Sequence, residues 1–445
     1  MLIEFSVANY RSFRDEVTFS MVANPLQEQD GKSDDRNQFA APGDISLLKS
    51  AAIYGANASG KSNLIAAFDF MQRFVRGSHE STEGTGGIGV EPFRLSTKTE
   101  SAPSFFEVVF IVGQDHYRYG FEVTEELVVS EWLHIMPQIE QGSEFQSNGD
   151  EVILFERESA SITLHELFEE EGRLLLEKTR PNALFLTVVA QFNGTIALRV
   201  SDWFGSMEIA SHWASVKLLM RLSTEQLVSD TDYLRAIEAL IAHLDLGIEA
   251  VQIEKVDLPE VTLPDHYPAE LQTAVGAISN LFKNVGHTKV KTVHRKVGDD
   301  GQPIGSEIFD LDRNESQGTE KLFSLAGTLL QCWKNGNILI IDELDASMHP
   351  LLTQEIVKLF NDSKINSSRA QLIFATQDTN LLDHRLLRRD QIWFTEKDRQ
   401  GASHLYSLVE FKIDDDAPFE KDYIQGRYGA IPFLGDVRQT FLEKD

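Results

Sequence analysis

The sequence predicts an α/β fold, and three features of the pattern support this prediction. The first is a short strand at 50–54 that leads through a glycine-rich loop into an amphipathic helix at 61–76. The second is a very apolar strand at 338–342 that ends in acidic residues, as in a buried parallel sheet. The third is a series of three strand-like runs within 104–136, which is typical of an antiparallel meander. A parallel sheet and an antiparallel lobe in one chain indicate a mixed α/β architecture.

The remaining elements are expected in chain order from their hydrophobic periodicity and turn residues. Residues 1–22 alternate as in a hairpin or two edge strands, and 24–46 are polar and are predicted to form a loop. Further along, the pattern predicts strands giving way to helix over 152–192, helices over 203–246 and 267–284, strands over 287–311, helices at 319–334 and 350–361, and a strand at 371–376.

The composition is that of a globular protein and excludes several classes. The chain has 445 residues, of which 42% are hydrophobic and 25% charged, which predicts two or three domains. No run of about 18 apolar residues occurs, so no membrane span is expected. The start, MLIEFSVANYRSF, lacks the pattern of a signal peptide, and Cys332 is the only cysteine. These features exclude disulfides and cysteine-based zinc sites and predict a cytoplasmic protein.

The net charge of −28 argues against tight, non-specific binding of nucleic acid by the whole surface. A local basic groove stays open, and nucleic acid therefore stays an open partner. The candidate is a run of basic residues that is more simply interpreted as a solvated strand face. It consists of Lys283, His287, Lys289, Lys291, His294, Arg295 and Lys296.

The segment GANASGKS, Gly55 to Ser62, matches the phosphate-loop pattern G-x-x-x-x-G-K-[ST] in full, between a strand and a helix. The two glycines let the backbone turn so that successive N–H groups point at phosphates, and the helix dipole adds positive potential. Lys61 is expected to reach the β- and γ-phosphates, and Ser62 to offer its hydroxyl to Mg²⁺. The nucleotide-binding residues predicted here are Gly55, Asn57, Ala58, Ser59, Gly60, Lys61, Ser62 and Asn63.

The segment ILIIDE, Ile338 to Glu343, supplies the second half of a nucleotide site. Asp342, at the carboxyl end of the apolar strand, is expected to hold the magnesium shell. Glu343 follows directly, where a carboxylate can polarise an attacking water as a general base. Together with the phosphate loop, this segment predicts a Mg²⁺-dependent ATPase.

The sequence that follows, LDASMHP at 344–350, carries a family resemblance. DELD followed by a short loop and HP resembles the D-loop of ABC-type ATPases of the SMC, DNA-repair and OLD class. NYRSF at 9–13 is similar to the N-terminal strand motif that faces the nucleotide in SMC-like heads. This similarity implies that Arg11 and Ser12 contact the nucleotide.

The same resemblance implies three further site positions. ESQGTEKLFSLAG, 315–327, stands where the ABC signature belongs; it departs from LSGGQ but keeps Ser316 and Gly318. Gln191, in LFLTVVAQFNG, occupies the place of a Q-loop glutamine that contacts nucleotide and Mg²⁺. Gln377 stands where the class carries a switch histidine, and because glutamine cannot titrate it would keep only a hydrogen-bonding role.

The resemblance extends over nearly the whole chain. EPFRL, SFFEVVF with YRYGFEV, TRPNALFL, LDLGI and YIQGRYGAIPFLGD together resemble the stand-alone bacterial ATPases of the RloA/AbiL type. These occur in anti-phage abortive-infection operons, often beside a Toprim-fold nuclease subunit. The resemblance implies a dimerising ATP-driven sensor or regulator of a partner effector such as a nuclease. The alternatives are an SMC-like DNA-repair or DNA-end-processing ATPase, which the lack of long heptad arrays disfavours, and an inert nucleotide-binding scaffold, which Glu343 disfavours.

Two other clusters have competing interpretations. Asp414–Asp416 could suggest a nuclease metal site, but a solvated acidic turn is favoured because too little chain follows for a Toprim domain. His349 could be a metal ligand, but no second histidine stands at ligand spacing, so a D-loop role near a dimer interface is favoured.

The expected architecture is an ABC-type P-loop ATPase head with an antiparallel β-lobe and a helical lid insertion. Residues 1–202 are expected to form the first lobe, 203–285 the lid, and 286–445 the second lobe. The signature serine of this class contacts the γ-phosphate across a dimer, so we expect a head-to-head dimer or a larger oligomer with ATP and Mg²⁺ at the interface.

Overall fold

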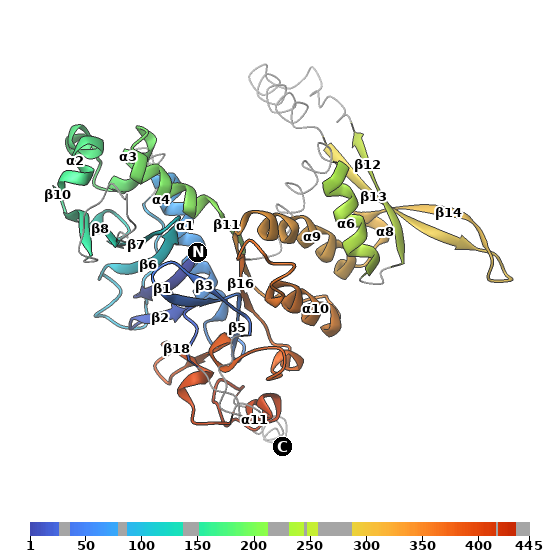
Figure 1. The fold of residues 1–445 in the computed structure, drawn as a ribbon. Helices are drawn as coiled ribbons and strands as arrows, with labels where there is room; N and C mark the ends of the chain where they lie inside the picture. The colour runs from blue at the N-terminus through green and yellow to red at the C-terminus, as the bar shows by residue number, and fades with distance from the viewer. Residues whose placement is uncertain are drawn as a thin grey trace, which may run out of the picture. The chain divides into compact units, whose positions relative to one another are not determined.

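The computed structural model describes residues 1–25, 36–78, 87–136, 151–211, 231–243, 247–256, 287–414 and 417–432 (Figure 1). The chain divides into two compact units. The first contains Met1–Ser211, Cys332–Asp345 and Thr353–Asp445, and the second contains His212–Gln331 and Ala346–Leu352.

The first unit contains a seven-stranded antiparallel sheet with the strand order β10-β9-β8-β7-β6-β1-β2. The hairpin β1–β2 pairs Phe5 with Phe19, and β1 also pairs with β6, so β2 is the edge strand. The strands are β1 (Leu2–Ala8), β2 (Val17–Ser20), β6 (Ser104–Val112), β7 (Asp115–Val123), β8 (Val128–Met136), β9 (Val152–Glu158) and β10 (Ser161–Leu164).

A second sheet of the same unit has the order β11-β15-β16-β5-β17-β18. All neighbouring pairs are parallel except β17–β18, so the carboxyl ends of five strands meet at one edge. The strands are β11 (Met207–Ala210), β15 (Ile338–Ile341), β16 (Gln371–Ala375), β5 (Ser50–Tyr54), β17 (Ile392–Lys397) and β18 (Ser403–Ser407). A small hairpin of β3 (Gln38–Ala41) and β4 (Ile45–Leu48) completes the strands.

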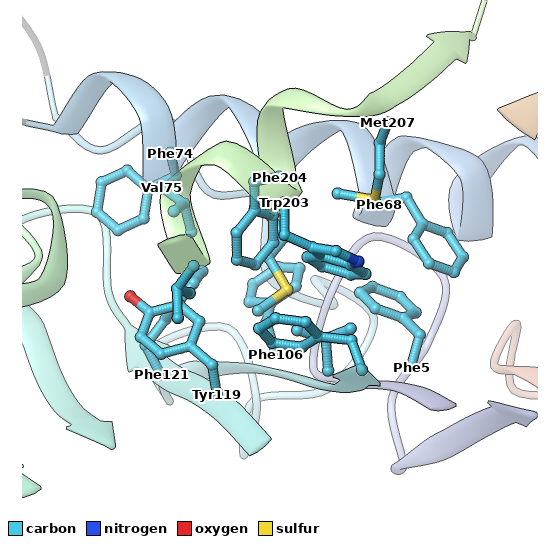
Figure 2. Close-up of a cluster of buried hydrophobic side chains, with 14 of the residues drawn as sticks. Phe5, Phe68, Phe74, Val75, Phe106, Tyr119, Phe121, Trp203, Phe204 and Met207 are labelled. Atoms are coloured by element: carbon cyan, nitrogen blue, oxygen red, sulfur yellow. The ribbon is translucent and has the colours of Figure 1, made fainter. Parts of the chain in front are cut away.

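Helix α1 (Lys61–Gly77) packs its apolar face into the main core of the first unit (Figure 2). Phe68 of α1 stacks on Phe5 of β1 with ring centroids 3.8 Å apart, and Phe110 stacks on Trp203 at 3.9 Å. Buried aromatic rings contribute large apolar areas, so these phenylalanine-rich segments serve the core. The other helices here are α2 (Glu166–Gly172), η2 (Arg173–Lys178), α3 (Phe185–Gln191), α4 (Thr195–Gly205), η3 (Thr379–Leu381), η4 (Arg389–Gln391), η5 (Leu408–Glu410) and α11 (Phe419–Ile424).

The second unit is built on a three-stranded antiparallel sheet of β12 (Ile248–Val256), β13 (His287–Val297) and β14 (Pro303–Asp310). Its core joins this sheet to α6 (Thr231–His243), α8 (Leu311–Asn314) and α9 (Gln317–Asn335). Helix α9 belongs to this unit as far as Gln331, and α10 (Pro350–Asn361) as far as Leu352. No described helix is long and apolar enough to cross a membrane.

The predicted fold class, α/β with an antiparallel lobe, is confirmed. Two segments differ from the expected elements. The predicted loop at 24–46 contains β3 and the start of β4, and the predicted helical lid contains two strands, β11 and β12, among its described residues. Strand β11 has only four residues, so its pairing with β15, not its local periodicity, makes it a strand. The helix predicted at 267–284 lies outside the described residues.

Candidate functional site

The phosphate loop joins β5 to the first turn of α1, as the sequence predicts. Gly55 and Gly60 have φ values of 155° and 127°, in the region that glycine adopts most easily. The loop is also closely packed, because a Cβ atom on Gly60 would lie 2.6 Å from Oγ of Ser403. A Cβ atom on Gly55 would overlap the backbone oxygen of Thr395. Both glycines are therefore required by conformation and by contact.

Lys61 opens α1 and is almost completely buried. Its ammonium group donates to the carbonyl oxygens of Gly55 at 2.7 Å and Ala56 at 3.2 Å. Burial lowers the pKa of Lys61, and the nearby carboxylates of Asp342, Glu343 and Asp345 oppose this shift. The structure thus places a buried cation inside the loop, where anionic phosphate oxygens can replace the two carbonyl partners.

Asp342 follows β15 and lies beside the start of α1. Burial raises the pKa of Asp342, while a hydrogen bond from Ser62 and the charge of Lys61 act in the opposite direction. The Oδ1 atom of Asp342 is buried and has no hydrogen-bond partner among the described residues. An unpartnered carboxylate oxygen beside a serine hydroxyl is the kind of donor set that Mg²⁺ prefers. These residues therefore fit the predicted magnesium position.

Glu343 and Gln377 lie at the carboxyl ends of two adjacent parallel strands, β15 and β16. Both side chains are exposed, and Glu343 adopts a left-handed φ of 51°. Such a conformation is strained in a residue with a side chain, and strained residues cluster at active sites. The next residue, Asp378, is fixed by a hydrogen bond, because the buried hydroxyl of Tyr54 donates to its carbonyl oxygen at 3.0 Å.

Ser12 lies in the turn between β1 and β2, and its side chain contacts residues next to the phosphate loop. Its Oγ atom accepts a hydrogen bond from the side-chain amide of Asn63 at 2.7 Å and lies 2.8 Å from the hydroxyl oxygen of Ser403, with which it shares a second hydrogen bond. Ser12 is 8% exposed, so its hydroxyl is committed to these protein contacts. The structure therefore places Ser12 in a buried hydrogen-bond network, to which the side-chain amide of Asn63 also belongs.

Arg11 forms an ion pair with Glu91 at 2.8 Å. It lines a surface pocket of about 380 Å³ together with Asn63, Glu91, Pro92, Arg94 and Leu95. This pocket adjoins the first turn of α1 through Asn63, so a nucleotide on the phosphate loop could extend toward it. The motif NYRSF indicated Arg11, whereas Glu91 and Arg94 were not predicted to lie beside it, although both belong to the motif EPFRL.

Gln191 is not brought to the phosphate loop. It is the last residue of α3, and that helix contacts the carboxyl-terminal end of α1, where Thr187 donates to the carbonyl of Val75 at 2.6 Å. Val75 lies 14 residues after Lys61, which corresponds to about 21 Å along a helix. The sequence-based placement of a Q-loop at Gln191 is therefore at odds with this geometry.

Strand topology indicates a different residue for that side of the site. Strand β11 runs parallel to β15, and the amide of Asp342 donates to the carbonyl of Ala210 at 2.9 Å. Ser211 is the next residue, so it stands at the carboxyl end of the sheet beside Asp342, where ligands of open α/β sheets bind. Ser211 was not predicted to lie at this edge, because the periodicity of 203–246 indicated a helix.

Ser316 and Gly318 lie in the second unit, at the amino end of α9. The Oγ atom of Ser316 accepts a hydrogen bond from the amide of Thr319 at 3.1 Å, the arrangement of a helix N-cap. Helix N-termini favour anions, which agrees with the predicted contact to a phosphate. Among the described residues, no group of histidine, cysteine and acidic side chains has the arrangement of a metal centre, and His349 is exposed.

A complete phosphate loop with a buried lysine, beside an acidic strand end, defines a P-loop protein. Residues 50–383 match the family model described as "AAA domain, putative AbiEii toxin, Type IV TA system". This match spans most of the chain, so the protein belongs to this AAA family. No curated protein matches the chain.

The chain is also similar to several solved structures. One is an Smc head bound to the C-terminal winged-helix domain of ScpA, with 14% identity, 91% of this chain and 97% of that chain covered, and a TM-score of 0.41. The recombination mediator protein RecF with ATP has 12% identity to this chain and a TM-score of 0.35, with 91% of this chain and 99% of that chain covered. The Smc head domain of Pyrococcus yayanosii, with a coiled coil and joint, has 12% identity and a TM-score of 0.38, with 95% of this chain and 99% of that chain covered.

Proposed function

We propose that this protein binds ATP with Mg²⁺ and hydrolyses it. The observation that carries the proposal is the cluster of Lys61, Ser62 and Asp342, in which a buried ammonium and an unpartnered carboxylate oxygen converge on the phosphate loop. Amide groups of the loop and the amino end of α1 would bind the phosphates. Lys61 would exchange its two carbonyl partners for phosphate oxygens.

Ser62 and Asp342 are the residues that would hold Mg²⁺, which supplies charge neutralisation of the phosphates when bound. Glu343 would orient and deprotonate the attacking water, and its exposed position on the edge of the sheet leaves room for substrate. Gln377 would donate or accept a hydrogen bond to the same water or to the γ-phosphate, without moving a proton.

The proposed active assembly is a dimer in which Ser316 and the amides near Gly318 of one subunit contact the γ-phosphate on the other. Support comes from the N-cap geometry of Ser316, which leaves the helix terminus with donors for an anion. A symmetric dimer closes two such sites at once.

At the level of the cell, we infer a role in bacterial anti-phage abortive infection, as an ATP-driven sensor or regulator of a partner effector such as a nuclease. The family description, which names a toxin–antitoxin context, supports this role. The DNA-repair alternative gains no support from the basic strand β13. Lys291, Arg295 and Lys296 form ion pairs with Glu254, Glu249 and Glu307.

The proposal is tested by measuring ATP binding to the wild type and to Lys61→Ala at equilibrium, with Lys98→Ala as a control for loss of an exposed lysine. We expect tight binding by the wild type and the control, and none by Lys61→Ala, because the buried cation is lost. Unchanged affinity in Lys61→Ala would show that the phosphate-loop assignment is wrong. Identification of the proteins that co-purify with the endogenous protein tests the regulatory role separately.

A further inference from the structure

Lys321 lies on the second turn of α9 and is almost completely buried, with 3% of its surface exposed. Its ammonium group donates a hydrogen bond to the carbonyl oxygen of Ala346 at 3.0 Å. Lysine is rarely buried, because a charged ammonium loses its hydration unless protein acceptors replace the water. The side chain thus ties α9 to the loop at 344–350, which is termed the D-loop below.

Gly318 makes a second contact with the same loop, one helical turn earlier. Residues three apart lie on one face of a helix, so Gly318 and Lys321 face the loop together. A Cβ atom on Gly318 would overlap the carbonyl oxygen of Ser347. Ser347 adopts a left-handed φ of 63°, which is uncommon for a residue with a side chain. The D-loop backbone therefore packs directly against the first two turns of α9.

Within this loop the chain passes from the first compact unit into the second. Asp345 is the last residue of its segment in the first unit, and Ala346 is the first of the next segment in the second. Leu344 is fixed in the first unit, because its amide donates to the carbonyl of Ala375 at 3.1 Å. Only Leu344 and Asp345 separate Glu343 from Ala346. A displacement of α9 that Lys321 passes to Ala346 therefore acts only three residues away from the left-handed backbone of Glu343.

We propose that Lys321 is a positioning residue for ATP hydrolysis, which couples the signature end of α9 to Glu343 by holding the D-loop against the helix. The inference rests on the proposed function, because Glu343 is the assigned base. When Ser316 engages a phosphate, Lys321 keeps Ala346 and Ser347 with α9, and the left-handed backbone at Glu343 responds to the new position of Ala346. The ammonium group itself contacts no substrate.

The first test measures hydrogen–deuterium exchange without nucleotide, so it does not depend on hydrolysis. Lys321→Met should increase exchange in peptides covering 344–349 by about tenfold or more, and leave the phosphate loop at 55–62 unchanged. The matched control is Lys334→Met, which removes an exposed lysine from the same helix and should change neither region. Unchanged exchange at 344–349 in folded Lys321→Met protein would overturn the inference.

The second test separates positioning from plain stabilisation by steady-state kinetics. Lys321→Met should lower kcat about tenfold or more with KM changed less than about threefold, because the nucleotide contacts of the first unit stay intact. Lys321→Arg, which keeps a charged donor, should recover most of kcat. If Lys321→Met does not fold, Lys321→Gln, which removes the charge and shortens the side chain, takes its place with the same expected split. If Lys321→Met lowers the melting temperature, changes KM as much as kcat, and is not rescued by arginine, the lysine has a structural role only. If the wild type has no ATPase activity, the proposed function is refuted. The exchange experiment then still tests whether Lys321 holds the D-loop against α9.

Discussion

The hydroxyl of Ser403 donates a hydrogen bond to the carbonyl oxygen of Ser59 at 2.6 Å, although 344 residues separate them in the chain. Ser403 lies at the start of β18, and Ser59 lies inside the phosphate loop. The same hydroxyl also contacts Ser12, and the amide of Ser403 donates to the carbonyl of Ser12 at 2.7 Å. The β17–β18 hairpin therefore fixes the outer side of the loop before any nucleotide arrives.

Ser403→Ala should weaken ATP binding and lower stability together. The substitution removes the hydroxyl that donates to the carbonyl oxygen of Ser59, and loss of a partner by a buried acceptor costs about 1–3 kcal/mol. We expect a lower melting temperature and an ATP dissociation constant raised about tenfold, because part of this cost falls on the loop conformation. Isothermal titration and thermal unfolding measure both. Ser161→Ala, at an exposed position on β10, is the control and should change neither; unchanged affinity in Ser403→Ala would mean that the loop holds its shape without the hairpin.

Asp342→Asn should stabilise the ligand-free protein at neutral pH and abolish Mg²⁺-dependent hydrolysis. Burial raises the pKa of Asp342, so the folded state binds a proton more readily than the unfolded state. The free energy of unfolding contributed by this group falls as the pH rises from the ordinary carboxyl pKa, about 4, through the raised folded value. The gain from asparagine should therefore be complete above that window and absent below it. Melting curves from pH 4 to pH 8 check this, and a pH-independent difference would exclude the titration of Asp342 as the cause.

Ser316→Arg should leave ATP binding by one head nearly intact but impair hydrolysis in the dimer, since the proposed contact is made across the interface. In a heterodimer with Lys61→Ala subunits, one composite site carries both lesions and the other carries none. We expect about half of the sites of that species to recover turnover. A verified heterodimer with no recovered ATPase would argue that both changes act in one subunit, or that both sites must act together.

Contiguous motifs account for what the sequence could predict. The phosphate loop and the acidic strand end depend on local spacing, so Gly55–Ser62 and Ile338–Glu343 predicted β5, α1 and β15 closely. The position of Ser403 could not be predicted, because the β17–β18 hairpin meets the loop only through sheet pairing between distant segments. Ser211 was missed for the same reason, since β11 is defined by its neighbour β15. Gln191 was expected at the nucleotide by resemblance to a Q-loop. Helix α3 instead packs on the carboxyl-terminal end of α1, away from the phosphate loop.

Comparison of the wild type with Glu343→Gln tests the proposed ATPase most directly. Glutamine keeps the size and hydrogen bonding of the side chain but cannot accept the proton of the attacking water. With both proteins at saturating ATP and Mg²⁺, we expect equal ATP binding, hydrolysis slowed at least ~10²-fold in Glu343→Gln, and accumulation of an ATP-bound dimer. Hydrolysis by Glu343→Gln at the rate of the wild type would contradict the assignment of Glu343 as the base and require another residue at the edge of the sheet.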